Sequence, residues 1–130
     1  ASEVDFFSLG TNDLTQYTLA IDRNHPRLAR DADPLHPAVL QLIHLSVRSA
    51  HDCAKRVSLC GDIASNPIAV PLWVGLGVDE LSVHFTEIPR IKAQICSLSY
   101  KDCQSLADHL LACSSLNEVK TKLRTTQQTA

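Results

Sequence analysis

Apolar residues follow two different periods along the chain, and the two periods predict strands and helices in alternation. The first run, VDFFSLG from Val4 to Gly10, is largely apolar and stops at glycine. Such a run is typical of a strand buried on both faces of a parallel sheet. Two shorter runs, at 57–60 and 79–84, are the other strand candidates.

Helical periods fill most of the remaining chain. The clearest helix begins at Pro37, which is tolerated at a first helical position, and its apolar residues recur at three- and four-residue steps to about Ala54. The segment 21–36 before it is polar and interrupted by proline, so we expect a long loop there. The other expected helices are shorter and begin near Thr11, Asn66, Thr86, Ser99 and Ser115. Thr11 and Asn12 are the expected capping residues of the first, and Ser99 with Asp102 and Ser115 with Glu118 resemble capping boxes of the last two.

The order is strand, helix, helix, strand, helix, strand and three helices. Buried strands that alternate with helices indicate an α/β chain with parallel strands. Three strands make a poor sheet by themselves, and a complete (β/α)8 barrel takes about 250 residues. The order therefore fits part of a TIM-type barrel. We expect residues 1–126 to form this portion and the polar residues 127–130 to be a disordered tail.

Composition narrows the functional classes. The 130 residues are 45% hydrophobic, which is enough for one core, and the net charge of −2 favours neither nucleic acid nor an anionic membrane as a partner. No apolar run approaches the ~20 residues that span a bilayer. The first residues contain two acids and no basic apolar leader, so we expect a cytoplasmic protein.

Cysteine usage agrees with a reducing compartment. The five cysteines are an odd number, without framework spacing and without a CxxC pair. Four of them fall in expected helices, and we interpret these as core or near-core thiols: Cys53, Cys96, Cys103 and Cys113.

Polar side chains follow the expected strands where an α/β enzyme places its site, at the carboxyl ends. These side chains are Asn12 and Asp13 after the first strand, Cys60 and Asp62 after the second, and His84 and Thr86 after the third.

Two readings stay open for the residues that follow the first strand. Asp13 is able to hold Mg²⁺ through oxygen while Asn12 orients an anion. Alternatively, Asn12 caps a helix and Asp13 complements its dipole, and spacing alone favours this second reading. Arg23, in the loop, is either a bidentate clamp for phosphate or carboxylate or a solvated arginine paired with Asp22.

Cys60 also has several candidate roles. A free thiol has a pKa of about 8.5 and is therefore a proton donor near neutral pH. Nearby cations would lower that pKa and make it a nucleophile, and burial as an inert thiol is the plain structural alternative. A Cys–His dyad with His36, His51 or His84 is a further option, but no spacing selects one of them.

Five blocks of the sequence are specific enough to indicate a family: FFSLGTNDLTQYTLAIDRN, DPLHPAVLQLI, VSLCGDIASNP, LWVGLGVDELSV and IPRIKAQICSLSY. In this order, from about Val4 to Tyr100, they closely resemble the C-terminal part of the barrel domain of enzyme I. Enzyme I is the phosphoenolpyruvate-protein phosphotransferase of the bacterial sugar phosphotransferase system. The resemblance implies a partial (β/α)8 barrel, roughly its last three βα units plus the C-terminal helices.

The resemblance also implies residue roles. Asp13 would be a Mg²⁺ ligand, Asn12 would bind the phosphate of phosphoenolpyruvate, and Arg23 would clamp the same phosphate. Cys60 would be the general acid that protonates C3 of the enolate. The reaction implied is phosphoryl transfer from phosphoenolpyruvate to a protein histidine with release of pyruvate, the first step of sugar uptake by this system.

The chain departs from the family pattern in the block around Cys60. The family motif ordinarily reads Cys-Gly-Glu, whereas Asp62 stands here in place of the glutamate. Ser65 and Asn66 replace a more usual glycine and aspartate.

The family's second metal carboxylate, additional arginines and phosphorylated histidine have no counterpart in the chain. We therefore expect the 130 residues alone to be inactive. The partners implied are phosphoenolpyruvate, pyruvate and a histidine-containing phosphocarrier protein that would bind through a missing N-terminal domain. The family's barrel domain dimerises, so we expect a homo-oligomer, and a dimerisation or assembly module is one alternative function. A fragment of a pyruvate phosphate dikinase or phosphoenolpyruvate synthase relative is another, because those enzymes share the GTNDLTQ and CG landmarks.

Overall fold

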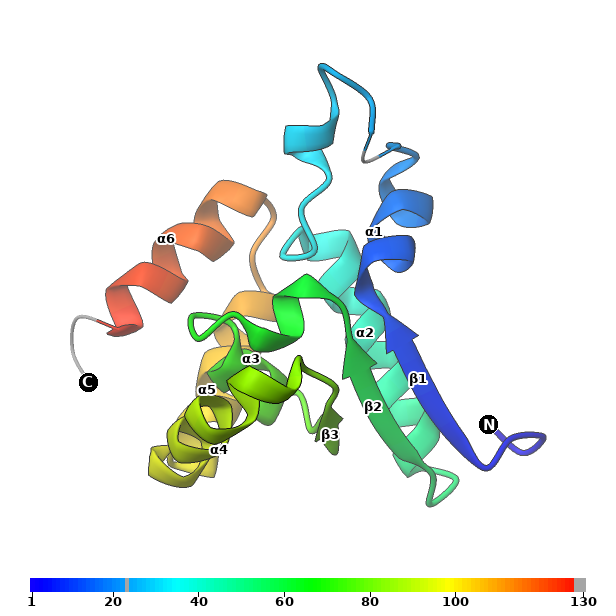
Figure 1. The fold of residues 1–130 in the computed structure, drawn as a ribbon, viewed down its shortest axis with the longest axis vertical. Coiled ribbons are helices and arrows are strands. Elements are labelled where there is room, and N and C mark those ends of the chain that lie inside the picture. The colour runs from blue at the N-terminus through cyan, green and yellow to red at the C-terminus, as the bar shows by residue number, and fades with distance from the viewer. Residues whose placement is uncertain (23, 128–130) are drawn as a thin grey trace.

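The computed structural model describes residues 1–22 and 24–127 and shows an α/β fold (Figure 1). The strands and helices, in chain order, are β1 (Phe6–Gly10), α1 (Thr11–Leu19), α2 (Pro37–His51), β2 (Arg56–Cys60), α3 (Val70–Gly75), β3 (Glu80–Leu81), α4 (Ile88–Ser97), α5 (Tyr100–Leu111) and α6 (Leu116–Gln127). Short 3₁₀ turns lie at Ala29–Asp31, Asp62–Ser65 and Phe85–Glu87.

The three strands form one parallel sheet in the order β1-β2-β3. Gly10 pairs with Cys60 and Leu59 with Leu81, so the strands end at one common edge. The expectation of an α/β chain with parallel strands is therefore confirmed.

Helices cover only one face of this sheet. In Figure 1, α2 lies behind β1 and β2, and no element of the described chain lies in front of these two strands. Val57 and Leu59 point to the covered face and are fully buried. The opposite, bare face carries Phe6, Ser8, Gly10, Arg56, Ser58, Cys60 and Glu80.

The prediction that the first strand is buried on both faces is wrong. Phe6 is 64% exposed, and exposed and half-buried residues alternate along β1. The reason is positional: β1 is an edge strand, and no described helix packs on its second face. An apolar run indicates that a strand is buried on at least one face. It does not determine whether another element covers the second face.

The core lies between the sheet and the helices. Val39, Leu40, Ile43 and Val47 of α2 are buried in it, together with Trp73 of α3, whose indole N–H donates to the carbonyl of Ile63 at 3.2 Å. The long amphipathic helix is thus confirmed, although it ends at His51. Ala54, its expected last residue, has φ +53° and stands outside the helix.

Two of the four helical cysteines are core residues as expected. Cys103 and Cys113 are buried, whereas Cys53 and Cys96 are exposed. Cys53 follows the end of α2, and Cys96 lies in the last turn of α4. None of the described helices is long and apolar enough to cross a membrane.

One carboxylate ties together three elements at the amino end of the sheet. Asp79 Oδ2 accepts hydrogen bonds from the backbone N–H of Val57 at 2.7 Å and from His51 Nε2 at 2.9 Å. Partial burial by itself would raise the pKa of the Asp79 carboxyl. The hydrogen bonds, together with the charges of His51 and Arg56, outweigh burial and hold this pKa below its ordinary value.

We expect Asp79→Asn to lower the free energy of unfolding at pH 7 by about 1.5 kcal/mol, because two hydrogen bonds to an ionised acceptor are weakened. A carboxyl whose pKa is lowered in the folded state stabilises the protein above its unfolded pKa of about 3.9, and this contribution is lost as the pH falls below that value. Urea unfolding at pH 7 and pH 3 measures both effects. Asp108→Asn, an exposed carboxylate on α5, is the control. Equal stabilities of Asp79→Asn and the unmodified chain at pH 7 would contradict the assignment.

Candidate functional site

The carboxyl ends of β1 and β2 are joined by a side chain of the helix that follows β1. Thr11 is fully buried, and its Oγ1 donates to the carbonyl of Cys60 at 2.8 Å. Thr15, one turn later, donates from its hydroxyl to the carbonyl of Thr11 at 2.6 Å. These bonds fix the start of α1 against the end of β2.

Gly61 makes this close approach possible. Its φ is +110° and its ψ is 173°, a conformation that side chains rarely adopt. A Cβ atom at Gly61 would lie 2.2 Å from Thr11 Oγ1 and 3.2 Å from Asn12 Oδ1. Only glycine therefore fits between Cys60 and the first turn of α1.

Cys60 lies at the end of β2 on the bare face of the sheet and is half-buried. Its Sγ is 3.5 Å from the carbonyl of Leu9 on β1, to which the thiol donates. The Cys60 side chain therefore lies at the carboxyl edge of the sheet and is only partly packed by its neighbours.

Asn12 does not cap the helix, contrary to the expectation that Thr11 and Asn12 are capping residues. The N-cap of α1 is Gly10, without a side-chain cap hydrogen bond. The Thr11 hydroxyl is taken up by Cys60, and Asn12 Nδ2 lies 3.5 Å from Asp62 Oδ2 across the edge of the sheet. The carboxamide of Asn12 is thereby turned toward the turn that follows Cys60.

Asp13 is exposed in the first turn of α1, where a negative charge favours the helix dipole. Its Oδ1 is 3.4 Å from Gln16 Nε2. In residues 1–22 and 24–127 no three His, Cys, Asp or Glu side chains are grouped so as to hold a metal ion. Asp13 therefore belongs to no such three-residue group among the described residues. Arg23, the fourth site residue expected from the sequence, lies outside the described residues.

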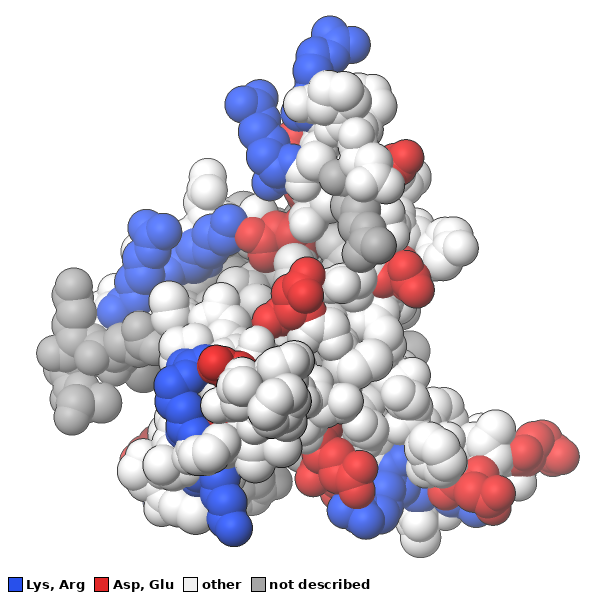
Figure 2. Space-filling model, in the orientation of Figure 1, with Lys and Arg blue, Asp and Glu red and all other residues white. Residues whose placement is uncertain are grey.

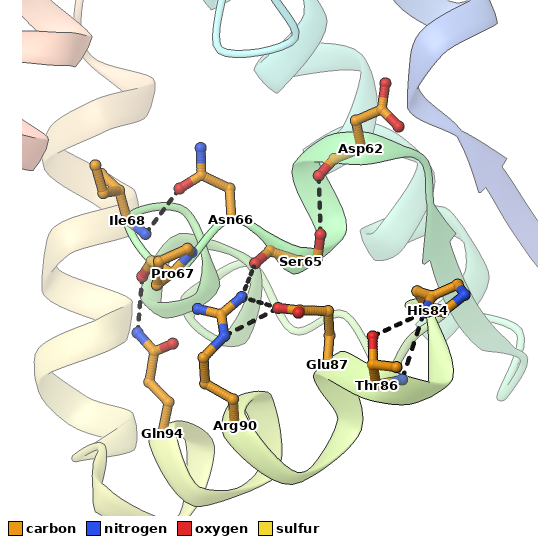
Figure 3. Close-up of polar contacts among 10 residues, drawn as sticks. All are labelled: Asp62, Ser65, Asn66, Pro67, Ile68, His84, Thr86, Glu87, Arg90 and Gln94. Carbon is orange, nitrogen blue, oxygen red and sulfur yellow. Dashed lines mark hydrogen bonds and ion pairs between the residues drawn. The ribbon is translucent and has the colours of Figure 1, made fainter.

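The turn after Cys60 is hydrogen-bonded to side chains of α4 (Figure 3). Arg90 donates to the carbonyl of Ser65 at 2.9 Å and forms an ion pair with Glu87. Gln94 donates to the carbonyl of Pro67 at 2.7 Å. Neither Arg90 nor Gln94 was expected from the sequence as a site-supporting residue. Their bonds reach backbone carbonyls more than twenty residues away, which no local pattern signals.

The two off-pattern residues of this turn have clear local roles. The Ser65 hydroxyl donates to the carbonyl of Asp62 at 3.2 Å, and Asn66 Oδ1 accepts from the backbone N–H of Ile68 at 3.0 Å. An aspartate at position 66 would accept the same bond through its carboxylate. The turn thus keeps its shape with Ser65 and Asn66 in place.

A cleft of about 500 Å³ extends from this edge toward α6. Asn12 and Asp62 line one end of it, and Lys120 and Arg124 of α6 line the other. Lys120 Nζ pairs with Asp33 Oδ2 at 2.6 Å across the cleft. Figure 2 shows Lys and Arg side chains gathered over α6 and over the loop before α2, outside the sheet edge itself.

Comparison with known proteins shows which family the chain resembles. The family model described as PEP-utilising enzyme, PEP-binding domain, matches residues 1–100. A multiphosphoryl transfer protein of Rhodobacter capsulatus is 50% identical over 120 residues, which is 92% of this chain and 14% of that protein. A phosphoenolpyruvate-protein phosphotransferase of Priestia megaterium is 45% identical over 119 residues, 92% of this chain and 21% of that protein. Multiphosphoryl transfer protein 2 of Escherichia coli K12 is 40% identical over 131 residues, 98% of this chain and 16% of that protein. The chain therefore spans about a fifth or less of the length of these relatives.

Gly61→Ala should destabilise the chain by about 2–3 kcal/mol, because the new Cβ meets Thr11 Oγ1 and the backbone conformation is strained for alanine. Gly10→Ala is the matched control at the end of the neighbouring strand. Its φ is −78° and nothing lies within 4 Å of the added Cβ, so a change within about 0.5 kcal/mol is expected. Urea unfolding measures both. If the two alanine variants lose the same free energy of unfolding, the contact between α1 and β2 at Gly61 is not tightly packed.

Arg90→Gln should speed amide hydrogen exchange in the turn 62–66 roughly tenfold, equivalent to about 1.4 kcal/mol of local opening, because the guanidinium bond to Ser65 is lost. Exchange in the strands should change far less. Lys92→Gln, on the same helix but with no partner among the described side chains, is the control. Unchanged exchange in the turn would mean that α4 does not hold it.

Proposed function

The chain belongs to the PEP-utilising enzyme, PEP-binding domain family, and from this we propose that it forms the carboxyl-edge part of a phosphoenolpyruvate site in a phosphotransferase. One observation carries the proposal. The Thr11 bond to the Cys60 carbonyl brings the first turn of α1, which contains Asn12 and Asp13, to the end of β2 at one edge of a parallel sheet. These are the positions at which α/β enzymes bind ligands.

The bare face of the sheet supports a barrel wall. Parallel sheets occur almost only where both faces are covered, either by two layers of helices or by closure into a barrel. Here helices cover one face, and the other carries small and polar residues such as Ser8, Ser58 and Cys60. We therefore propose that the three strands are a segment of a (β/α)8 barrel and that the bare face is its interior.

The proposed roles follow the order of the strands along the edge. Asn12, after β1, donates to the phosphate of phosphoenolpyruvate, and Arg23 clamps the same phosphate. Asp13 would be a carboxylate ligand of Mg²⁺, and a bound Mg²⁺ would neutralise charge on the phosphate. Cys60, after β2, faces the carbon skeleton from the bare side.

In the proposed reaction the bond between phosphorus and the enol oxygen breaks, and the phosphoryl group passes to a nitrogen of a protein histidine. The bonding electrons stay on the oxygen and give the enolate of pyruvate. C3 of the enolate takes a proton from Cys60 Sγ, which yields pyruvate. The thiolate takes up a proton from solvent, and this balances the proton that the histidine releases when its nitrogen is phosphorylated. Such transfer depends chiefly on positioning and on charge stabilisation, which the fixed edge of the sheet supplies.

Relatives named phosphoenolpyruvate-protein phosphotransferase favour this reaction over that of a dikinase or synthase. The whole reaction also needs residues outside this chain, so we propose that the 130 residues contribute to the activity without having it alone. The open edge of β1 and the bare face are surfaces on which further strands or a second copy of the chain could pack. Association of two copies would correspond to the alternative function, a dimerisation or assembly module that forms a homo-oligomer. A histidine-containing phosphocarrier protein and a cytoplasmic location complete the proposal.

A chimaera tests the role of Cys60 directly. The aligned segment of the Priestia megaterium phosphotransferase is replaced by this chain, and phosphoenolpyruvate-dependent phosphorylation of a histidine carrier is measured. We expect activity to be retained. Cys60→Ala should lower the rate at least ~10²-fold, the usual contribution of a general acid.

Cys53→Ala, an exposed thiol remote from the site, is the control and should leave the rate unchanged. A chimaera that is active but indifferent to Cys60→Ala would remove the thiol from the mechanism. A folded but inactive chimaera would contradict the proposed function itself.

A further inference from the structure

His84 occupies the third strand end of the same edge. The N–H of Ser82 donates to the carbonyl of Leu59 at 2.9 Å, so β3 stays paired with β2 up to the level of Cys60. β3 itself ends at Leu81, and His84 is the exposed residue that precedes the next 3₁₀ turn, at the carboxyl edge where Cys60 ends β2. Its backbone is extended, with φ −60° and ψ 141°, which continues the strand direction to the edge.

The imidazole of His84 has one nitrogen engaged and one available. The backbone N–H of Thr86 donates to Nδ1 at 3.4 Å, and Thr86 Oγ1 lies 2.8 Å from the same nitrogen (Figure 3). Because a backbone N–H only donates, Nδ1 is the acceptor, and the proton of the neutral ring is on Nε2. Nε2 has no hydrogen-bond partner among the described residues.

The ring is held in place by its neighbours. The Phe85 ring lies 4.5 Å from it, centroid to centroid, at an interplanar angle of 38°. The bond with Thr86 also caps the 3₁₀ turn that leads into α4. His84 is therefore an exposed N–H donor of fixed orientation and not a freely rotating surface side chain.

We propose that His84 binds the carboxylate of the pyruvyl end of the ligand through its Nε2–H. This inference rests on the proposed function. Neighbouring strands are about 4.8 Å apart, so β1, β2 and β3 present their end groups in a row along the edge. If the phosphate lies over Asn12 and C3 over Cys60, the next position along the row faces the carboxylate. Arg90 of α4 is already bound to Glu87 and Ser65, which leaves this donor role to His84.

His84→Asn separates the binding role from the structural one. Asparagine is a good cap and keeps a side-chain acceptor for the Thr86 N–H, but it lacks the Nε2–H donor. The melting temperature of the variant should therefore stay that of the unmodified chain. His109→Asn, an exposed histidine on α5, is the control. Thr86→Val, which frees the ring, is a second variant should His84→Asn fail to fold.

The test uses the full chain labelled with ¹⁵N, titrated by NMR with oxalate, a planar dicarboxylate resembling the enolate, and separately with inorganic phosphate, both in the presence of Mg²⁺. We expect dissociation constants on the order of 1 mM, which shifts of the backbone amides resolve. His84→Asn should raise the constant for oxalate about tenfold or more, as the loss of a charge-assisted hydrogen bond does. The constant for phosphate should change less than about twofold.

The ring itself provides an independent readout. The ¹⁵N spectrum of the His84 ring should show the proton on Nε2 when the ring is neutral. The Nε2 signal should shift when oxalate is added. A proton on Nδ1, or equal oxalate binding by His84→Asn and the unmodified chain, overturns the inference and leaves the proposed function intact. A complete lack of response to both ligands, together with an inactive chimaera, overturns the two together.

Discussion

The contact between the buried hydroxyl of Thr11 and the carbonyl of Cys60 is the constraint on which the whole site depends. It joins the first turn of α1 to the last residue of β2, and it is possible only because position 61 has no Cβ. Every candidate group at the edge is placed relative to this contact. Asn12 is the next residue along α1, Asp62 the next but one after Cys60, and the thiol itself ends the strand that the contact fixes. A change of a few tenths of an ångström here would move the donor and the thiol relative to each other.

The two faces of the sheet have different surroundings, one covered by helices and the other bare. Burial of Val57 and Leu59 against α2 and α3 holds the strands in register, so the helical face supplies the stability. The bare face carries small and polar side chains, among them Cys60, the residue to which we assign the proton transfer in the proposed function. The carboxyl edge is rigid because its turns are tied to helices, by Thr11 on one side and by Arg90 and Gln94 on the other.

The sequence predicted well what depends on local pattern. The long helix after Pro37, the serine caps of α5 and α6, and the gathering of Asp13 and Cys60 at one edge all follow from periodicity and from the rule that parallel strands end together. The glutamate of the last capping box differs in detail, because Glu118 accepts from the N–H of Ser114, and this bond lowers its pKa.

What the sequence did not predict depends on partners distant in the chain. Thr11 was expected to cap its own helix, but its hydroxyl donates instead to the carbonyl of Cys60 on the neighbouring strand β2. The exposure of Phe6 follows from what lies beside β1, which an apolar run does not encode. The anchoring of the turn 62–66 by Arg90 joins residues 25 positions apart, and it depends on how α4 crosses the turn.

The departures from the family motif separate into two kinds when their contacts are compared. Ser65 and Asn66 bond to backbone groups inside their own turn, so these substitutions preserve a shape and need no change elsewhere. Asp62 is different, because its carboxylate reaches out of the turn to Asn12 Nδ2 at 3.5 Å, at the long limit of a hydrogen bond. A glutamate, one methylene longer, would extend farther toward Asn12. The shorter Asp62 therefore leaves the Asn12 carboxamide less tightly held from this side, and the position of Asn12 depends correspondingly more on the hydrogen bond between Thr11 and Cys60.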